Sequence, residues 1–261
     1  MILPLASGTF EPLAPSDRSA DWAVTGRLGG VSSGLYASAN IADHVGDTPE
    51  SVAINREQLA HILGLTADDL VLMKPVHGAD FLWMSTPGTA EAVDAVITDQ
   101  PRIGLVAMGA DCATIGIVGT RSPWSAPNSR VIAAVHCGWQ GLCRNVLGAT
   151  LEEMKRLGVT TFEAVIGPAI CGDCYRVGED RIERIRVECA THIAQAALVS
   201  PGGIDVRAGL LADLGARSIP VRVVGGCTYE EPDQFFSYRR DHVTGRQGLG
   251  ITLKESPYGP L

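Results

Sequence analysis

The chain has 261 residues, of which 46% are hydrophobic and 19% are charged, and its formal net charge at pH 7 is −8. This composition excludes a disordered chain, and the acidic balance argues against a nucleic-acid-binding or anionic-membrane surface, since both need clustered Lys and Arg. No window approaches the roughly 20 apolar residues of a membrane span, no basic leader opens the sequence, and an odd count of seven cysteines favours reduced thiols, so we expect a cytoplasmic protein.

The first predicted element is a helix over 48–63, with Asp47 or Thr48 as its cap and Pro49 and Glu50 in its first turn. Short apolar runs then predict strands over 70–73, 81–84, 95–98, 104–107, 114–118 and 131–135, and the polar segment 120–130 is interpreted as a surface hairpin. A helix over 142–157, a strand over 163–166, a helix over 179–199 and strands over 221–224 and 250–253 follow. Because strands occur in runs rather than in βαβ units, the pattern predicts an α+β layered fold, a single domain over residues 1–261.

Three apolar segments end in side chains that can bind a metal ion. One predicted strand ends at His77, two apolar runs flank Asp111 and Cys112, and another strand leads to His136 before a glycine-rich turn. The ends of regular elements are where a rigid scaffold aims side chains into a shared pocket. Two imidazoles and one thiolate suit zinc, and three protein ligands leave a fourth position for water or substrate.

The same residues allow two other interpretations. Cys112 could be the nucleophile of a metal-free hydrolase, with His136 or His77 as its base. Buried cysteines and histidines are also common without any function, and the spacing of these three matches no local metal-binding motif. Cys171 and Cys174 have CxxC spacing but no second CxxC, and we interpret them as incidental thiols, with a second metal site or a redox bond as the minority alternative.

Short motifs that run in order through most of the chain resemble one known family. They are Gly29-Gly30-Val31-Ser32, Tyr36, Asn40, His44-Val45-Gly46-Asp47, Asn55-Arg56, Val76-His77-Gly78, Val93-Asp94-Ala95-Val96-Ile97-Thr98, Ala110-Asp111-Cys112, His136-Cys137-Gly138-Trp139, Ile166-Gly167-Pro168, Tyr175, Val177-Gly178, Cys227-Thr228, Phe235-Phe236-Ser237-Tyr238-Arg239-Arg240-Asp241 and Thr244-Gly245-Arg246. The family is that of the laccase-domain polyphenol oxidase proteins, also called purine nucleoside phosphorylase / adenosine deaminase, whose bacterial members include the peptidoglycan editing factor.

The resemblance implies a single-domain, four-layer α/β/β/α fold with a mixed β-sandwich core. It also implies zinc bound by His77, Cys112 and His136, and activity on adenosine, inosine and methylthioadenosine. Copper-dependent oxidation is the weaker interpretation, because two histidines and one cysteine are too few for a multicopper centre. Zinc is therefore the expected cofactor, with copper as the alternative.

The sequence departs from the family pattern at three positions next to the predicted ligands. Pro75, Thr114 and Gln140 stand where the family usually has Gln, Pro and Arg. The last change removes a positive charge close to a predicted ligand, which bears on anion binding and on substrate preference.

Phosphorolysis of a nucleoside needs a phosphate clamp, and the planar fork of arginine is suited to that role. Among four candidates we favour Arg56 and Arg239, whose local motifs resemble the family's, over Arg240 and Arg246. His44 and Asp111 are candidate proton carriers, and Asp111 could instead orient a zinc-bound histidine. Asn40 and Phe236 are further candidates for substrate binding, and the aromatic candidates for stacking on a purine are Trp139, Phe235, Phe236 and Tyr238.

The expected partners are thus a purine nucleoside and phosphate, bound by a monomer or homodimer, with no nucleic acid and no membrane. The main alternative is a Cys–His amide hydrolase that edits peptidoglycan precursors. A non-enzymatic binding protein is a third hypothesis, which the acidic composition does not favour.

Overall fold

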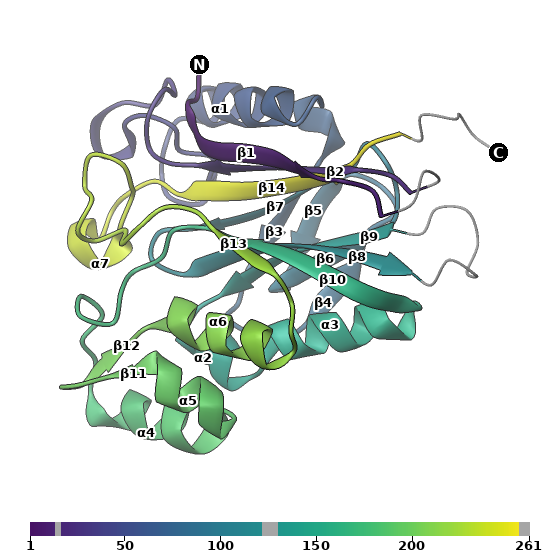
Figure 1. Ribbon diagram of the computed structural model, residues 1–261. Coiled ribbons are helices and arrows are strands. Elements are labelled where there is room, and N and C mark those ends of the chain that lie inside the picture. Colours follow the sequence, from purple (N-terminus) through teal and green to yellow (C-terminus); the bar gives the residue numbers. More distant parts are fainter. Residues whose placement is uncertain (14–16, 122–129, 256–261) are drawn as a thin grey trace.

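Two six-stranded β-sheets pack face to face at the centre of the protein, and helices cover their outer faces (Figure 1). The computed structural model describes residues 1–13, 17–121 and 130–255. The first sheet has the order β1 (Pro4–Phe10), β2 (Ala20–Thr25), β14 (Gln247–Leu253), β7 (Gly104–Gly109), β3 (Leu70–Lys74), β5 (Gly88–Glu91). The second has the order β13 (Val221–Val223), β10 (Val159–Ile166), β8 (Ala113–Arg121), β9 (Arg130–Cys137), β6 (Ala95–Thr98), β4 (Phe81–Trp83). Both sheets mix parallel and antiparallel pairs.

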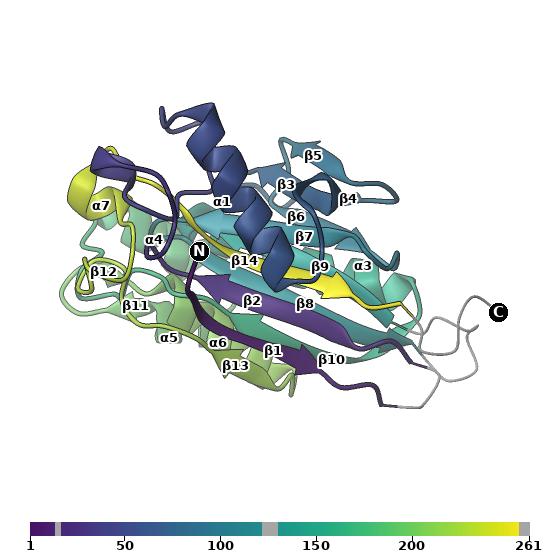
Figure 2. The same ribbon diagram turned by 90° about the horizontal axis from the view of Figure 1, so that it is seen from above.

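The helices form the two outer layers. Helix α1 (Pro49–Ile62) crosses the outer face of the first sheet, as Figure 2 shows from above. The opposite layer contains α2 (Trp139–Cys143), α3 (Val146–Arg156), α4 (Glu179–Glu188), α5 (Thr191–Ala197) and α6 (Val206–Ala216), together with the short pair β11 (Leu198–Val199) and β12 (Gly203–Ile204). The four-residue helix α7 (Tyr238–Asp241) lies at one end of the sandwich. Among the described residues, no helix is both long and apolar enough to cross a membrane.

Each boundary between layers has its own apolar core. Val71, Leu105, Ile132 and Ile251 belong to the cluster between the two sheets. The second sheet packs against its helices through a larger cluster, and α1 packs on the first sheet through a third. Strand β9 is buried along its whole length because both of its faces are covered, which explains its continuous apolar sequence.

The register of the second sheet places three segments side by side at one end of the sandwich. Ala113 pairs with Cys137 and Ala95 pairs with Val135, so the residues that precede β8 and β6 lie next to the end of β9. The backbone N–H of His136 donates to the carbonyl of Asp94 at 2.8 Å. Asp94, Cys112 and His136 therefore meet although they are distant in the sequence.

The predicted α+β class and the four layers agree with the structure, and all nine predicted strands are present. Two predicted helices are wrong in extent. The helix predicted over 142–157 is two helices, because Asn145 adopts a left-handed φ of 58° between α2 and α3. The helix predicted over 179–199 is α4 and α5 with an extended break at Cys189, and it ends in β11. Helix α6 and strands β1, β2 and β5 were not predicted, and the predicted hairpin at 120–130 falls mostly on 122–129, outside the described residues.

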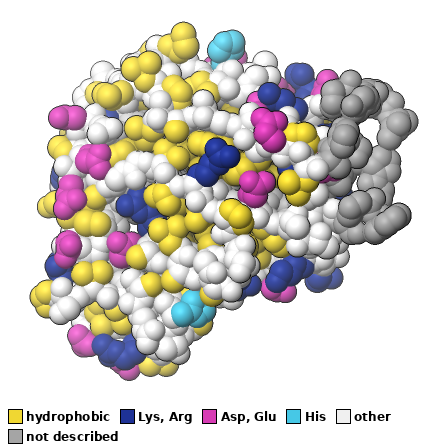
Figure 3. Space-filling view, viewed as in Figure 1, with side chains coloured by type: hydrophobic (Ala, Val, Ile, Leu, Met, Phe, Trp, Pro, Cys, Tyr) yellow, Lys and Arg dark blue, Asp and Glu magenta, His cyan; other side chains and the backbone are white. Residues whose placement is uncertain are grey.

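Charged side chains are interspersed on the face seen in Figure 3, where acidic and basic groups alternate with apolar ones. This face has no large area of a single sign among the residues that are drawn in colour. A polyanion binds through clustered positive charge, and this side of the molecule does not offer it.

Candidate metal centre

His77, Cys112 and His136 come together at the end of the sandwich where β3, β8 and β9 meet. Their candidate donor atoms all lie within 4.8 Å of one another. Sγ of Cys112 is 3.7 Å from Nε2 of His77, and the two imidazole rings stand edge to face with 4.9 Å between their centroids. Two imidazoles and one thiol around a common point form a donor set that fits a zinc-like divalent ion.

One buried carboxylate, Asp94, positions two of these three residues. Its Oδ1 lies 2.9 Å from Nδ1 of His136. A carboxylate only accepts hydrogen bonds, so Nδ1 carries the proton and Nε2 is left as the donor atom for a metal ion. The same carboxylate accepts the backbone N–H groups of Val76, His77 and Gly78 at 3.2, 3.0 and 2.6 Å. It thereby holds His77 in its left-handed conformation, with a φ of 58°.

The carboxylate that orients a histidine is Asp94 and not Asp111. The histidine-orienting role suggested for Asp111 is therefore wrong. The Asp111 carboxylate accepts the Thr228 hydroxyl at 2.7 Å and the backbone N–H of Arg239 at 2.6 Å. With its own φ of 101°, Asp111 ties the turn before Cys112 to the C-terminal loops. The sequence signal that was missed is a carboxylate directly before a strand, inside the matched motif at 93–98.

Gly138 leaves room for the ligands at the end of β9. A Cβ at this position would lie 2.8 Å from Cδ2 of His77 and 3.0 Å from Sγ of Cys112. Any side chain would therefore occupy space beside the donor atoms.

In the metal-free protein, Cys112 and His136 form a charged pair. Burial alone raises the pKa of the Cys112 thiol, but His136 and His77 outweigh this effect and bring it to about 6. Burial alone lowers the pKa of His136, but the Cys112 thiolate and Asp94 outweigh this effect and bring it to about 9. Between these two values the site holds a thiolate next to an imidazolium.

This pairing predicts a pH-dependent affinity for Zn²⁺. A metal ion needs Nε2 of His136 without its proton, and the raised pKa of that group means that the proton is present up to a pH of about 9. We expect the affinity to rise about tenfold per pH unit between pH 6 and 9, more steeply below pH 6 where Cys112 is also protonated, and to level off above pH 9.

Competition with a chelator over this pH range measures the slope, after correction for the chelator's own protonation. In the Cys112→Ser variant the thiolate that raises the pKa of His136 is absent, so the pKa of that imidazole, followed by NMR without metal, should fall below about 9. An affinity of the natural protein that does not change between pH 7 and 8.5 would contradict the charged pair.

A pocket of about 460 Å³ opens onto the three residues. The residues that line it are His44, Lys74, Pro75, His77, Met108, Gly109, Ala110, Cys112, His136, Tyr238 and Arg246. Arg246 is held there by hydrogen bonds from Nη1 to the carbonyls of Thr244 and Gly245, both at 2.9 Å. The pocket thus joins the candidate ligands to two cations, Lys74 and Arg246.

Comparison with known proteins identifies the family. The family model described as "Multi-copper polyphenol oxidoreductase laccase" matches residues 21–254. The chain belongs to this family. The family resemblance of the sequence motifs is thereby confirmed.

Relatives within this laccase-like family cover nearly the whole chain. A Corynebacterium glutamicum protein named purine nucleoside phosphorylase is 36% identical over 253 residues, covering 94% of this chain and 98% of that protein. A Deinococcus radiodurans protein of the same name is 36% identical over 245 residues, with 91% of each chain covered. Among solved structures, YlmD from Geobacillus stearothermophilus has a TM-score of 0.78 at 29% identity, covering 95% of this chain and 97% of its own. The hypothetical protein YfiH from Bacillus licheniformis has a TM-score of 0.78 at 27% identity, covering 94% and 99%. These likenesses confirm the four-layer α+β fold.

The three positions where this chain departs from the usual laccase-like pattern differ in whether they line the pocket. Pro75 is part of its wall, whereas Gln140 is not among the residues that line it. Thr114 is buried and pairs with His136 across β8 and β9. Only Pro75 therefore directly changes the surface that a ligand would meet.

Of the remaining predicted residues, His44 lines the pocket and the two favoured arginines do not. Burial and the nearby charge of Arg246 lower the pKa of His44, so its imidazole is neutral at pH 7 and suited to carrying a proton. Nε of Arg56 donates to the carbonyl of Ile41, and its Nη2 lies 3.2 Å from Asp43. Arg56 thus fixes the loop that carries His44.

The structure also changes the ranking of the other arginines as candidates for phosphate binding. The Arg239 side chain donates to the carbonyl of Arg176 and packs on Tyr175, in a separate surface hollow. Arg240 pairs with Asp241 and bonds backbone carbonyls, as expected of a structural residue. Arg246, which the motifs ranked lower, is the arginine that lines the pocket.

Asn40 and Phe236 are fully buried, so direct contact with substrate does not fit their positions. Asn40 accepts the backbone N–H of Arg246 at 2.9 Å and therefore supports the pocket from behind. Phe236 packs under the guanidinium of Arg27. Of the aromatic candidates for stacking, Tyr238 alone lines the pocket within the described part of the chain.

Proposed function

We propose that this protein is a metal-dependent purine nucleoside phosphorylase that acts on adenosine, inosine and methylthioadenosine, and that it deaminates adenosine in the same pocket. One observation carries the proposal: a zinc-like donor set, two cations and a neutral histidine share one pocket. The names of its laccase-like relatives support a purine nucleoside and phosphate as substrates.

The resident ion in this proposal is zinc, held by His77, Cys112 and His136. The donor set fits it, because Nδ1 of His136 is engaged by Asp94 and a thiolate is already favoured at Cys112. When bound, zinc supplies Lewis-acid stabilisation of negative charge on oxygen. Copper is the alternative, but this cluster has only two imidazoles among the described residues, fewer than a multicopper centre requires.

The protein's own groups account for the remaining requirements of phosphorolysis. In that reaction a phosphate oxygen bonds to C1′ of the ribose while the bond from C1′ to the purine nitrogen breaks, and the departing base takes up a proton. Arg246 is the first candidate to hold phosphate, with a fork that two backbone carbonyls fix in place, and Lys74, whose Nζ bonds Glu91 at 2.8 Å, is the second. His44 in its neutral form has one N–H donor to offer to the base.

The first test measures metal content and turnover together. Protein purified without a metal-affinity tag is analysed for bound metals, and adenosine is supplied with and without phosphate. We expect about one zinc at this centre that is lost in His77→Ala and Cys112→Ser, and base release only when phosphate is present. Protein without metal and without purine turnover would overturn the proposal.

A second candidate function is a metal-free amide hydrolase for peptidoglycan precursors, and the thiolate–imidazolium pair of Cys112 and His136 favours it. Such a nucleophile reacts quickly with iodoacetamide in the purified protein, whereas a zinc-bound thiolate is shielded until a chelator is added. Rapid alkylation of Cys112 without chelator would favour the amide hydrolase over the phosphorylase.

Replacement of Arg246 tests which arginine holds phosphate. Loss of a charge-assisted hydrogen bond costs about 1.5–3 kcal/mol, so Arg246→Met should lower kcat/KM for phosphate about 10–100-fold. Arg239→Met is the matched control, because Arg239 lies outside the pocket and its contact with Asp111 comes from the backbone. Steady-state kinetics with varied phosphate measure both, and a larger loss in Arg239→Met would reverse the assignment.

A further inference from the structure

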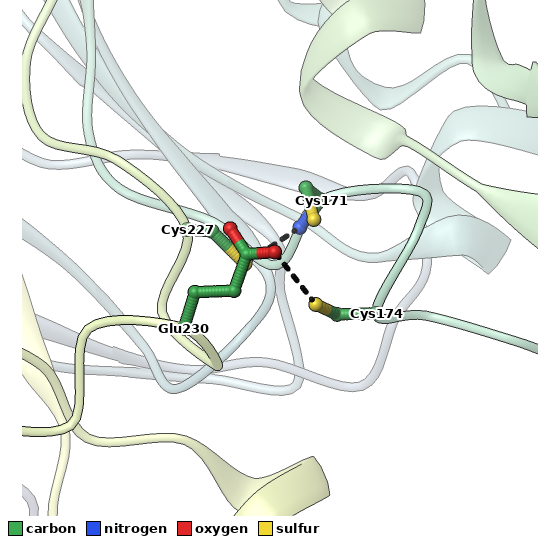
Figure 4. Close-up of side chains that lie close together, drawn as sticks. All are labelled: Cys171, Cys174, Cys227 and Glu230. Atoms are coloured by element: carbon green, nitrogen blue, oxygen red, sulfur yellow. Dashed lines mark hydrogen bonds between the residues drawn. The ribbon is translucent and has the colours of Figure 1, made fainter.

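A second group of metal-binding side chains lies outside the pocket. Cys171, Cys174, Cys227 and Glu230 place their candidate donor atoms within 4.8 Å of one another (Figure 4). We call this group the second cluster. All three of its cysteines are free thiols.

The fold brings these residues together through two adjacent parallel strands. Strands β10 and β13 pair in parallel from Ala164 with Val221 to Ile166 with Val223, so the loops that follow them leave the same end of the sheet. The loops continue side by side, with a bridge between Ala169 and Cys227 and a hydrogen bond from the N–H of Thr228 to the carbonyl of Ala169. One loop supplies the CxxC pair and the other supplies Cys227 and Glu230.

The local backbone turns the donor atoms toward one another. The carbonyl of Cys171 accepts the N–H groups of Cys174 and Tyr175 at 3.2 and 2.9 Å, which folds the CxxC segment into a tight turn. The N–H of Cys171 donates to Sγ of Cys227 at 3.3 Å, and the thiol of Cys174 donates to Oε1 of Glu230 at 3.5 Å. Figure 4 shows both contacts as dashed lines between the two loops.

We propose that Cys171, Cys174, Cys227 and Glu230 bind a second zinc ion, one that is structural rather than catalytic. Three thiolates and one carboxylate provide four protein ligands, the number that closes a tetrahedral site. A disulfide between two of the cysteines would leave the third thiol and the carboxylate without a role. The N–H group of Cys171 donates to Sγ of Cys227 and so holds this sulfur atom toward the other three side chains.

The second ion would fix the loops that border the candidate metal centre. Thr228, next to Cys227, donates to Asp111 in the turn before Cys112. Tyr175, next to Cys174, packs under Arg239, whose backbone N–H also bonds Asp111. Cys227 is therefore adjacent to one residue that bonds this turn, and Cys174 is adjacent to a residue that packs on the side chain of another.

The zinc content of variants in which the first centre, or both sites, are disabled tests the proposal. In the Cys112→Ser variant, which disables the first centre, elemental analysis of the full chain should still find one zinc per chain. Adding Cys171→Ser or Cys227→Ser to that variant should remove it, and adding Cys189→Ser, a thiol outside both clusters, should not. After chelation, Co²⁺ added to the Cys112→Ser protein should give thiolate-to-cobalt charge-transfer absorption with the d–d bands of a tetrahedral site.

A milder substitution distinguishes loss of the metal site from misfolding. Glu230→Gln keeps all three thiols, so it should retain the thiolate–cobalt absorption while binding Co²⁺ about tenfold more weakly. Two results would overturn the proposal. One is a Cys112→Ser protein that contains no zinc and shows no thiolate absorption with Co²⁺. The other is a disulfide between any two cysteines of the second cluster, found by peptide mapping of freshly purified protein.

Discussion

Asp94→Asn is expected to weaken Zn²⁺ binding at the candidate metal centre by about 10–100-fold, the usual cost of losing the partner of a metal-bound histidine. The carboxylate accepts one imidazole N–H and three backbone N–H groups. Asparagine has the same shape but only one accepting oxygen, and its amide group would point N–H donors at other donors. It also removes the charge that fixes the proton on Nδ1 of His136, so the tautomer with Nε2 available to the ion is no longer favoured.

Competition with a chelator at pH 7.5 measures this loss, and thermal unfolding shows whether the fold survives. Asp213→Asn is the matched control, because Asp213 is also buried, pairs with Arg217 and does not line the pocket. That variant should lose some stability and keep its Zn²⁺ affinity. An Asp94→Asn protein with unchanged affinity would show that the positions of His77 and His136 do not depend on this carboxylate.

Gly138→Ala is expected to reduce Zn²⁺ affinity by at least about 100-fold, because ligand atoms must stay within about 0.5 Å of their productive positions. The new methyl group would stand 2.8 Å from the His77 ring and 3.0 Å from Sγ of Cys112. The backbone of Gly138, with φ −92° and ψ −176°, is extended and suits alanine. The effect therefore comes from the methyl group at the centre and not from strain in the chain.

The control for this experiment is Gly215→Ala, in helix α6. A Cβ at Gly215 meets nothing within 4 Å, and alanine in a helix stabilises it by about 0.5–1 kcal/mol relative to glycine. That variant should keep full metal content and melt at the same or a higher temperature. Normal zinc content in Gly138→Ala would mean that His77 and Cys112 can move apart without loss of binding.

Two of the strands that the sequence predicted, β8 and β9, lie at the centre of the second sheet. Strands β8 and β9 read as continuous apolar runs because one face meets the other sheet and the other meets helices. Strand β1 was missed because it lies at a sheet edge, and Pro4, Ser7 and Gly8 break its apolar pattern. The left-handed turn at Asn145 was missed because an amphipathic pattern continues across it.

The site was partly predictable for a related reason. The three proposed ligands stand at strand ends, which the local pattern reveals, whereas the contact of Asp94 with His136 depends on the pairing of Ala95 with Val135. Local motifs also cannot tell which arginine faces the pocket. Arg246 does so because Asn40, from the other end of the chain, holds its backbone N–H.

The part played by Asp94 also bears on how the protein would acquire its ion. Since this carboxylate holds the His77 backbone and the His136 ring in the metal-free fold, the conformational entropy of arranging those ligands is lost during folding. Little of the free energy of metal binding is then spent on reorganisation, in contrast to zinc fingers, which are unfolded without metal. A chain folded in a zinc-poor cell would keep a preorganised centre, and the supply of metal rather than folding would set the fraction of loaded molecules.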